Sequence, residues 1–164
     1  MARYSMGFTT KTMTAVADGA PMTDNGYAGF VQGGNGTMQL RFSEVYIGGE
    51  STSSTPTTMA FGRDSTVAAT AISGNFTANF DGSSTAPGTT AVIGCVSTTK
   101  PQRSATLGRL LGLSFNAFGG VTRWQARQGE EITTIGNTAS LGEVSLSSIT
   151  GAGIVSGHIH YELV

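Results

Sequence analysis

The chain has few residues of the kinds that cross-link or anchor a protein. Its one cysteine, Cys95, cannot form a disulfide within the chain, and its place in the apolar run 91–96 indicates a small buried residue. No segment approaches the ~20 apolar residues of a membrane helix. Residues 1–11 lack the apolar stretch of a secretory signal. These absences predict a soluble product of the host cytoplasm with no membrane partner.

Charge is also scarce, at 12% of the 164 residues with a formal net charge of −1. Proteins that bind nucleic acid face the phosphates with clustered Lys and Arg, so this composition predicts no DNA or RNA partner. A monomer that is dissolved alone usually carries a more charged surface. The low charge therefore favours a surface that is partly covered in an assembly.

Glycine, threonine and serine are abundant instead, with 24 glycines and few lysines and glutamates. Glycine is unfavourable inside helices, whereas threonine suits strands and lysine and glutamate suit helix surfaces. A chain of this length can bury one core. The composition predicts a single all-β domain of short strands and tight turns.

Alternating apolar and polar residues locate the strands. The clearest alternation spans 38–47, where Leu40, Phe42, Glu44 and Tyr46 are expected on one face and Gly48-Gly49 is expected to end the strand. Other strands are expected at 59–63, 71–77, 90–97, 109–117, 121–126, 132–135, 142–149 and 154–164. A total of roughly eight to ten strands predicts a two-sheet antiparallel β-sandwich, jelly-roll-like.

The first 26 residues look different from the rest. Residues 1–26 mix Thr, Ala, Met and Gly and close on the turn signal Asp24-Asn25-Gly26. We expect them to form an extended N-terminal arm or an edge strand. Residues 27–164 are expected to form one β-sandwich domain.

The residues that could support catalysis form no complete set. His158 and His160 lie two positions apart, hence on one face of the last strand, where they could bind a metal or meet copies of themselves in a ring. No Asp or Cys joins them at ligand spacing. Glu130 and Glu131 are adjacent and are expected in a solvated turn rather than across a cleft. We therefore predict no enzyme, no cofactor and no metal site, and a cupin-like barrel enzyme would lack ligands.

Several stretches resemble small virion proteins of tailed bacteriophages. They are EVYIGGESTSSTPT at 44–57 and SFNAFGGVTRW at 114–124, with similar texture at 129–132, 141–147 and 158–162. The resemblance implies a capsid decoration, or cement, protein. Such a protein is a homotrimeric β-sandwich on the outer head surface that binds the major capsid protein and stabilises the shell.

That role requires a rigid scaffold, an edge or arm that can add a strand to the capsid, and a weakly charged surface. The first 26 residues are the expected gripping arm. Candidate subunit-interface or capsid-contact residues are Phe115, Phe118, Arg123, Trp124, His158 and His160.

Two other functions remain open. A carbohydrate-binding or adhesion module would use Trp124 and tyrosines as an exposed stacking platform. A tail or fibre component of a virion would also be β-rich and oligomeric. Ring faces that are open to solvent and coplanar would favour sugar binding, whereas burial of Trp124 against another subunit would favour the assembly role.

Overall fold

A computed structural model describes residues 3–33, 39–68, 76–79, 92–134 and 141–164. These ranges contain twelve strands and no helix, which confirms the all-β prediction. The strands are β1 (Arg3–Thr12), β2 (Tyr27–Gln32), β3 (Leu40–Glu50), β4 (Pro56–Thr66), β5 (Phe76–Asn79), β6 (Val92–Gly94), β7 (Gln102–Arg103), β8 (Leu111–Asn116), β9 (Phe118–Gln125), β10 (Ile132–Thr133), β11 (Glu143–Thr150) and β12 (Ile154–Leu163).

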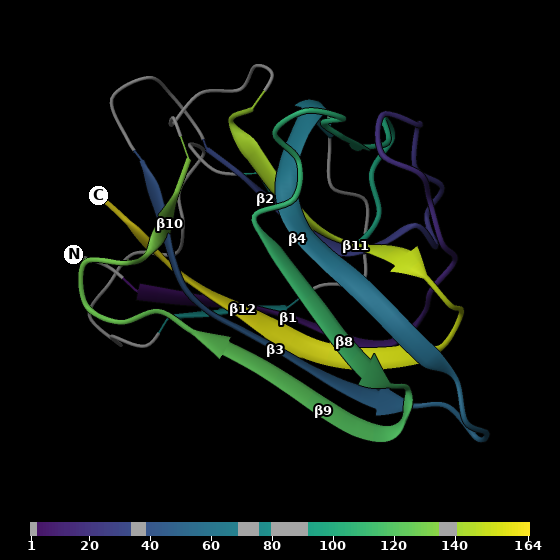
Figure 1. Cartoon of the computed structure of the whole chain (residues 1–164). Coiled ribbons are helices and arrows are strands. Elements are labelled where there is room, and N and C mark those ends of the chain that lie inside the picture. Colours follow the sequence, from purple (N-terminus) through teal and green to yellow (C-terminus); the bar gives the residue numbers. More distant parts are fainter. Residues whose placement is uncertain (1–2, 34–38, 69–75, 80–91, 135–140) are drawn as a thin grey trace.

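The strands form two antiparallel sheets that pack face to face (Figure 1). Sheet A has the order β10-β3-β12-β1-β5, and β9 also pairs with β3. Sheet B has the order β6-β2-β11-β4-β7, and β8 also pairs with β4. The chain alternates between the sheets from β1 to β6. The predicted β-sandwich is therefore confirmed, while its jelly-roll character is not.

One apolar core lies between the sheets. Sheet A contributes Phe8, Phe42 and Ile159, and sheet B contributes Phe61 and Leu146, all with no exposed surface. The rings of Phe42 and Phe61 meet edge to face across the core, with centroids 5.1 Å apart. This contact joins the two sheets through the geometry that aromatic pairs prefer.

Residues 3–12 are a strand inside sheet A, not an arm. β1 pairs with β12 on one side and with β5 on the other, and Tyr4, Met6 and Phe8 are buried. The following residues also bond to the body, because Met13 N–H donates to the carbonyl of Gly153. The extended arm expected over 1–26 is therefore not confirmed, and β1 is not available to grip a capsid. Its apolar alternation was obscured by the glycine and threonine around it.

The predicted strand 38–47 lies in β3, but two details were wrong. The strand continues through Gly48 and Gly49 to residue 50. A Cβ on Gly49 would lie 2.2 Å from the carbonyl oxygen of Ala117, so this glycine permits a close approach rather than ending the strand. Leu40 and Phe42 face the core, and Glu44 does not share their face.

A β-bulge causes that change of face. His160 pairs with Glu44 and Tyr161 pairs with Phe42, which leaves Ser43 without a partner on β12. β3 also exchanges partners here, since Phe42 pairs with β10 and Glu44 pairs with β9. The extra residue turns Val45 and Ile47 inward and turns Glu44 outward.

The strands predicted at 109–117 and 121–126 correspond to β8 and β9, but they lie in different sheets and do not pair with each other as a hairpin. β8 pairs with β4 in sheet B, and β9 pairs with β3 in sheet A. The side chain of Asn116 shapes the turn, because its Oδ1 accepts hydrogen bonds from the backbone N–H groups of Thr55 and Phe118. β8 and β9 therefore link the sheets at one side of the sandwich (Figure 1).

The other strand predictions met mixed outcomes. Strands at 59–63, 142–149 and 154–164 correspond to β4, β11 and β12, while β2 and β7 were not predicted. Of the strand predicted at 132–135, β10 covers 132–133, and residue 135 lies outside the described ranges. β4 begins at Pro56, before the predicted start at residue 59, and continues to Thr66. Of the strand predicted at 71–77, residues 71–75 lie outside the described ranges. The same holds for residues 90–91 of the strand predicted at 90–97.

Candidate functional site

The outer face of sheet A carries polar and aromatic side chains in two rows. Each row crosses four paired strands, β1, β12, β3 and β9, and the period of two along a strand directs these side chains away from the core. The first row is Gly7, His158, Tyr46 and Arg123, and the second is Ser5, His160, Glu44 and Gln125. Strand pairing thus brings together residues that are distant in sequence.

Glu44 lies at the centre of this cluster. His158 Nε2 lies 2.8 Å from its Oε1, and Arg123 Nη2 donates to its Oε2 over 2.7 Å. His160 Nδ1 lies 3.9 Å from the same Oε2. The Glu44 side chain is 9% exposed, whereas the Arg123 side chain is 53% exposed. The carboxylate is therefore enclosed by three side chains, of which Arg123 is the most exposed.

Three rings stack beside this carboxylate. Tyr46 and His158 are nearly parallel, with centroids 5.2 Å apart and an interplanar angle of 9°. His158 and His160 are closer still, at 4.2 Å and 17°. Because each ring fixes its neighbour, the imidazole nitrogens keep a defined position relative to Glu44.

The pKa shifts show which groups carry charge. Burial disfavours ionised Glu44, but hydrogen bonds from Arg123 and His158 hold the pKa of this carboxyl below its usual value. Burial, together with the neighbouring His158, lowers the pKa of His160. At neutral pH the cluster therefore presents an anionic carboxylate beside a neutral imidazole.

Two open hollows flank the cluster. One, of about 430 Å³, is lined in part by Tyr46, His158 and the glycines at 48, 49 and 157. The other, of about 260 Å³, is lined in part by Glu44, Gln125 and His160. The cluster is thus reachable from solvent along the face of the sheet.

The six residues predicted at an interface separate into groups. Arg123, His158 and His160 are brought together around Glu44. Phe118 is 57% exposed at the start of β9. Phe115 and Trp124 are partly buried and pack against the core. Trp124 therefore presents only part of its ring to solvent, which weakens the stacking platform that the carbohydrate-binding alternative would use.

Sequence reasoning missed Glu44 and Tyr46. The prediction of ligands beside the two histidines considered Asp and Cys and overlooked Glu, and β3 lies beside β12 and places Glu44 directly opposite His160. The alternation within 38–47 marked both residues, but it assigned them to the face of Leu40 and Phe42. Neither the strand order nor the bulge could be derived from that pattern. The cluster lies on the outside of a sandwich, so it is not the interior site of a cupin-like barrel.

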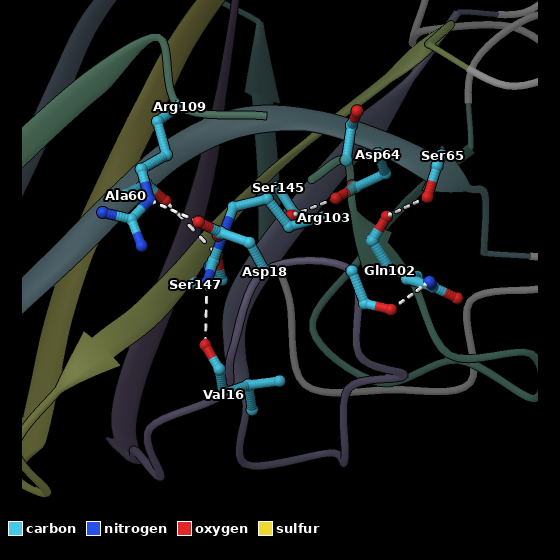
Figure 2. A network of polar contacts seen from close by, with 12 residues as sticks. Val16, Asp18, Ala60, Asp64, Ser65, Gln102, Arg103, Arg109, Ser145 and Ser147 are labelled. Atoms are coloured by element: carbon cyan, nitrogen blue, oxygen red, sulfur yellow. Dashed lines mark hydrogen bonds and ion pairs between the residues drawn. The ribbon is translucent and has the colours of Figure 1, made fainter. Parts of the chain in front are cut away.

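A second polar network is buried on the side of sheet B (Figure 2). The Arg103 guanidinium donates to Asp18, to the Ser147 hydroxyl and, over 2.7 Å, to the carbonyl of Val16. Asp18 also pairs with Arg109 at 2.6 Å. These bonds attach the segment between β1 and β2 to β7 and β11, so we assign the network a structural role.

No protein-family model, curated protein or solved structure matches this chain. Within the described ranges there is also no helix long and apolar enough to cross a bilayer.

Proposed function

We propose that the chain is a non-enzymatic structural protein of a virion, a homotrimeric decoration protein that binds the major capsid protein on the outside of a phage head. The resemblance of 44–57 and 114–124 to phage virion proteins supports this proposal. These two stretches adjoin in the fold, because residues 44–50 of β3 pair with residues 118–125 of β9. The sparse charge of the chain supports a surface that is covered in an assembly.

The observation that carries the proposal is the edge formed by β9. Among the described residues, this eight-residue strand pairs with β3 alone. It contains no Lys and no Pro, which often block pairing at natural edges. Phe118 and Val121 leave 57% and 59% of their surface exposed along it. An unpaired backbone edge beside exposed apolar side chains suits the addition of a strand from another chain.

We assign this edge to the contact between copies of the chain. Phe118 and Val121 would pack against a neighbouring copy, which removes apolar surface from water. A closed ring of identical contacts has cyclic symmetry, and three copies give the trimer. The rest of the outer surface then remains available to bind the major capsid protein.

Light scattering after size-exclusion chromatography tests the oligomer. We expect about 50 kDa at micromolar concentration, three times the 16.8 kDa of one chain. The double change Phe118→Glu with Val121→Glu should give a monomer. Leu107→Glu is the matched control, since Leu107 is similarly exposed, at 54%. Leu107 lies before the start of β8, whereas β9 follows the end of β8. A monomeric wild-type chain, or a trimer that survives the double change, would refute the β9 contact.

Binding to heads tests the capsid role separately. The purified chain is mixed with heads assembled from the major capsid protein of the same phage and sedimented. We expect saturable decoration and greater resistance of the heads to heat. Failure to bind would overturn the decoration role. Immunoelectron microscopy of virions distinguishes the alternative, because label on the tail would assign the chain to a tail or fibre.

A further inference from the structure

We propose that Glu44, His158 and His160 form a binding site for a divalent transition-metal ion of the zinc class on the outer face of sheet A. One donor atom from each of the three residues lies within 4.8 Å of the other two. The inference concerns a single chain and does not rest on the proposed capsid role.

The donor set suits such an ion. Two imidazole nitrogens and one carboxylate oxygen are ligands that Zn²⁺ prefers, and three protein ligands leave a fourth position for water. Metal–donor bonds of about 2.0–2.2 Å require donors about 3.4 Å apart in a tetrahedral site. Since no two of the donors lie more than 4.8 Å apart, closing a pair to that distance takes at most about 1.4 Å. His158 Nε2 and Glu44 Oε1, at 2.8 Å, instead move slightly apart. Both changes are within the reach of small torsional changes at the ends of the side chains.

The backbone already holds the ligands in place. β12 carries both histidines and pairs with β1 and β3 on its two sides. Glu44 lies directly opposite His160 on β3. Tyr46 stacks on the far side of His158 and fixes that ring. Ligands on paired, interior strands of a sheet lose little freedom on binding, which favours a defined site.

Glu44 divides its two oxygens between neighbours. Oε2 accepts from Arg123, and Oε1 lies against His158 Nε2. When Nε2 is protonated, its proton occupies the position that a cation would take between these two atoms. Exchange with solvent can move the proton to Nδ1 of the same ring, which frees the Nε2 lone pair for the metal.

Arg123 is the competing cation. Its side chain is 53% exposed, so it can move into solvent when a metal arrives. We therefore expect Arg123→Gln to tighten metal binding several-fold. Weaker binding in Arg123→Gln would contradict the competition.

Titration of the full chain with ZnCl₂ tests the site, using protein without a polyhistidine tag and a chromophoric chelator as competitor. We expect one Zn²⁺ per chain. His158→Ala, His160→Ala and Glu44→Gln should each weaken binding at least 10-fold. Glu130→Gln is the matched control, because Glu130 is exposed and lines neither hollow beside the cluster, so the change should leave the affinity unchanged. Circular dichroism without metal verifies that each variant is folded.

The histidine signals give an independent readout. The chain has two histidines, so the imidazole region of an NMR spectrum contains one set of signals from each. Zn²⁺ should shift both sets together at one equivalent. The proposal fails if millimolar Zn²⁺ leaves both sets unmoved. It also fails if the double change His158→Ala with His160→Ala still binds one Zn²⁺ per chain.

Discussion

At the residue scale, Arg103 is the largest fully buried side chain among the described residues. Its guanidinium donates hydrogen bonds to Asp18, to the Ser147 hydroxyl and to the carbonyl of Val16. Removing one partner of a buried charge network leaves the other buried groups without a partner, and the free energy of unfolding typically falls by about 3–5 kcal/mol. Arg103 therefore fixes the segment that follows β1 to the body of sheet B.

We predict that Arg103→Met lowers the free energy of unfolding by about 3–5 kcal/mol, measured by urea denaturation. Arg109→Met is the matched control, because Arg109 pairs with the same Asp18 but its side chain is 54% exposed. That change should cost about 1 kcal/mol or less. Equal losses in the two variants would show that burial of Arg103 is not the cause.

Asp64 and Glu143 form a buried acidic pair nearby. Both have no exposed surface, and burial raises the pKa of each carboxyl. The Ser145 hydroxyl donates to Asp64 Oδ1 over 2.9 Å. Among the described residues no donor is found for Asp64 Oδ2. A protonated Glu143 would supply an O–H donor, whereas two ionised carboxylates can only accept hydrogen bonds.

This pair makes stability depend on pH in a defined direction. In the unfolded chain both carboxyls lose their protons near pH ~4. In the folded chain Glu143 keeps its proton at higher pH. Above about pH 4 the folded state thus binds more protons than the unfolded state, and the contribution of the pair to stability falls as pH rises.

We predict that Glu143→Gln flattens this fall, by up to about 1.4 kcal/mol per pH unit, because the amide cannot ionise. Its oxygen can still accept from the N–H of Ala68 and its NH₂ can donate to Asp64. Urea denaturation at pH 5, 7 and 9 measures the slope. Glu131→Gln, in an exposed turn, should leave the slope unchanged. A wild-type slope in Glu143→Gln would refute the protonated pair.

At the element scale, the pairing of β12 with β3 depends on Gly157. A Cβ at this position would lie 2.0 Å from the carbonyl oxygen of Tyr46 and 2.9 Å from the Phe8 ring. Neither neighbour can yield easily, since one is strand backbone and the other is core. β12 carries both histidines of the candidate site, so the close approach at Gly157 also positions that site.

We predict that Gly157→Ala lowers the free energy of unfolding by about 1–3 kcal/mol, measured by thermal and urea denaturation. Gly112→Ala in β8 is the matched control, because a Cβ there meets nothing within 4 Å. That change should be neutral or should stabilise by up to about 1 kcal/mol. A neutral Gly157→Ala would mean that β3 and β12 are less closely packed than described.

Individual strands show how much of the fold the local sequence patterns could predict. The strands at 142–149 and 154–164 were predicted closely, because alternation of apolar and polar residues continues through them. β1 was taken for an arm, since its environment is rich in Thr and Gly and its partners lie at the other end of the chain. The bulge at Ser43 left no signal, because it arises where β3 exchanges β10 for β9.

At the scale of the whole molecule, the proposed trimer contact is apolar and the net charge is −1. Salt screens charge but has little effect on the burial of apolar surface at moderate concentration. We predict that the dissociation constant of the trimer changes less than about three-fold between ~0.05 M and ~0.5 M NaCl. Sedimentation equilibrium measures it. A strong loss of affinity in salt would assign the contact to charged residues such as Arg123 instead.

Local sequence patterns are enough to specify the class of the fold. The 24 glycines, the abundant threonine and the alternating segments specify an all-β chain of two antiparallel sheets, because these are local preferences that each segment carries alone. The period of two also placed His158 and His160 on one face.

Only the tertiary structure decided what those histidines face. Glu44 and Arg123 reach them because β12, β3 and β9 are neighbours, and because a bulge turns Glu44 out of the core. Strand order and bulges depend on contacts between distant segments, which local patterns do not encode. For the same reason, local patterns did not show that β1 lies inside a sheet between β12 and β5, or that Trp124 packs against the core of its own chain.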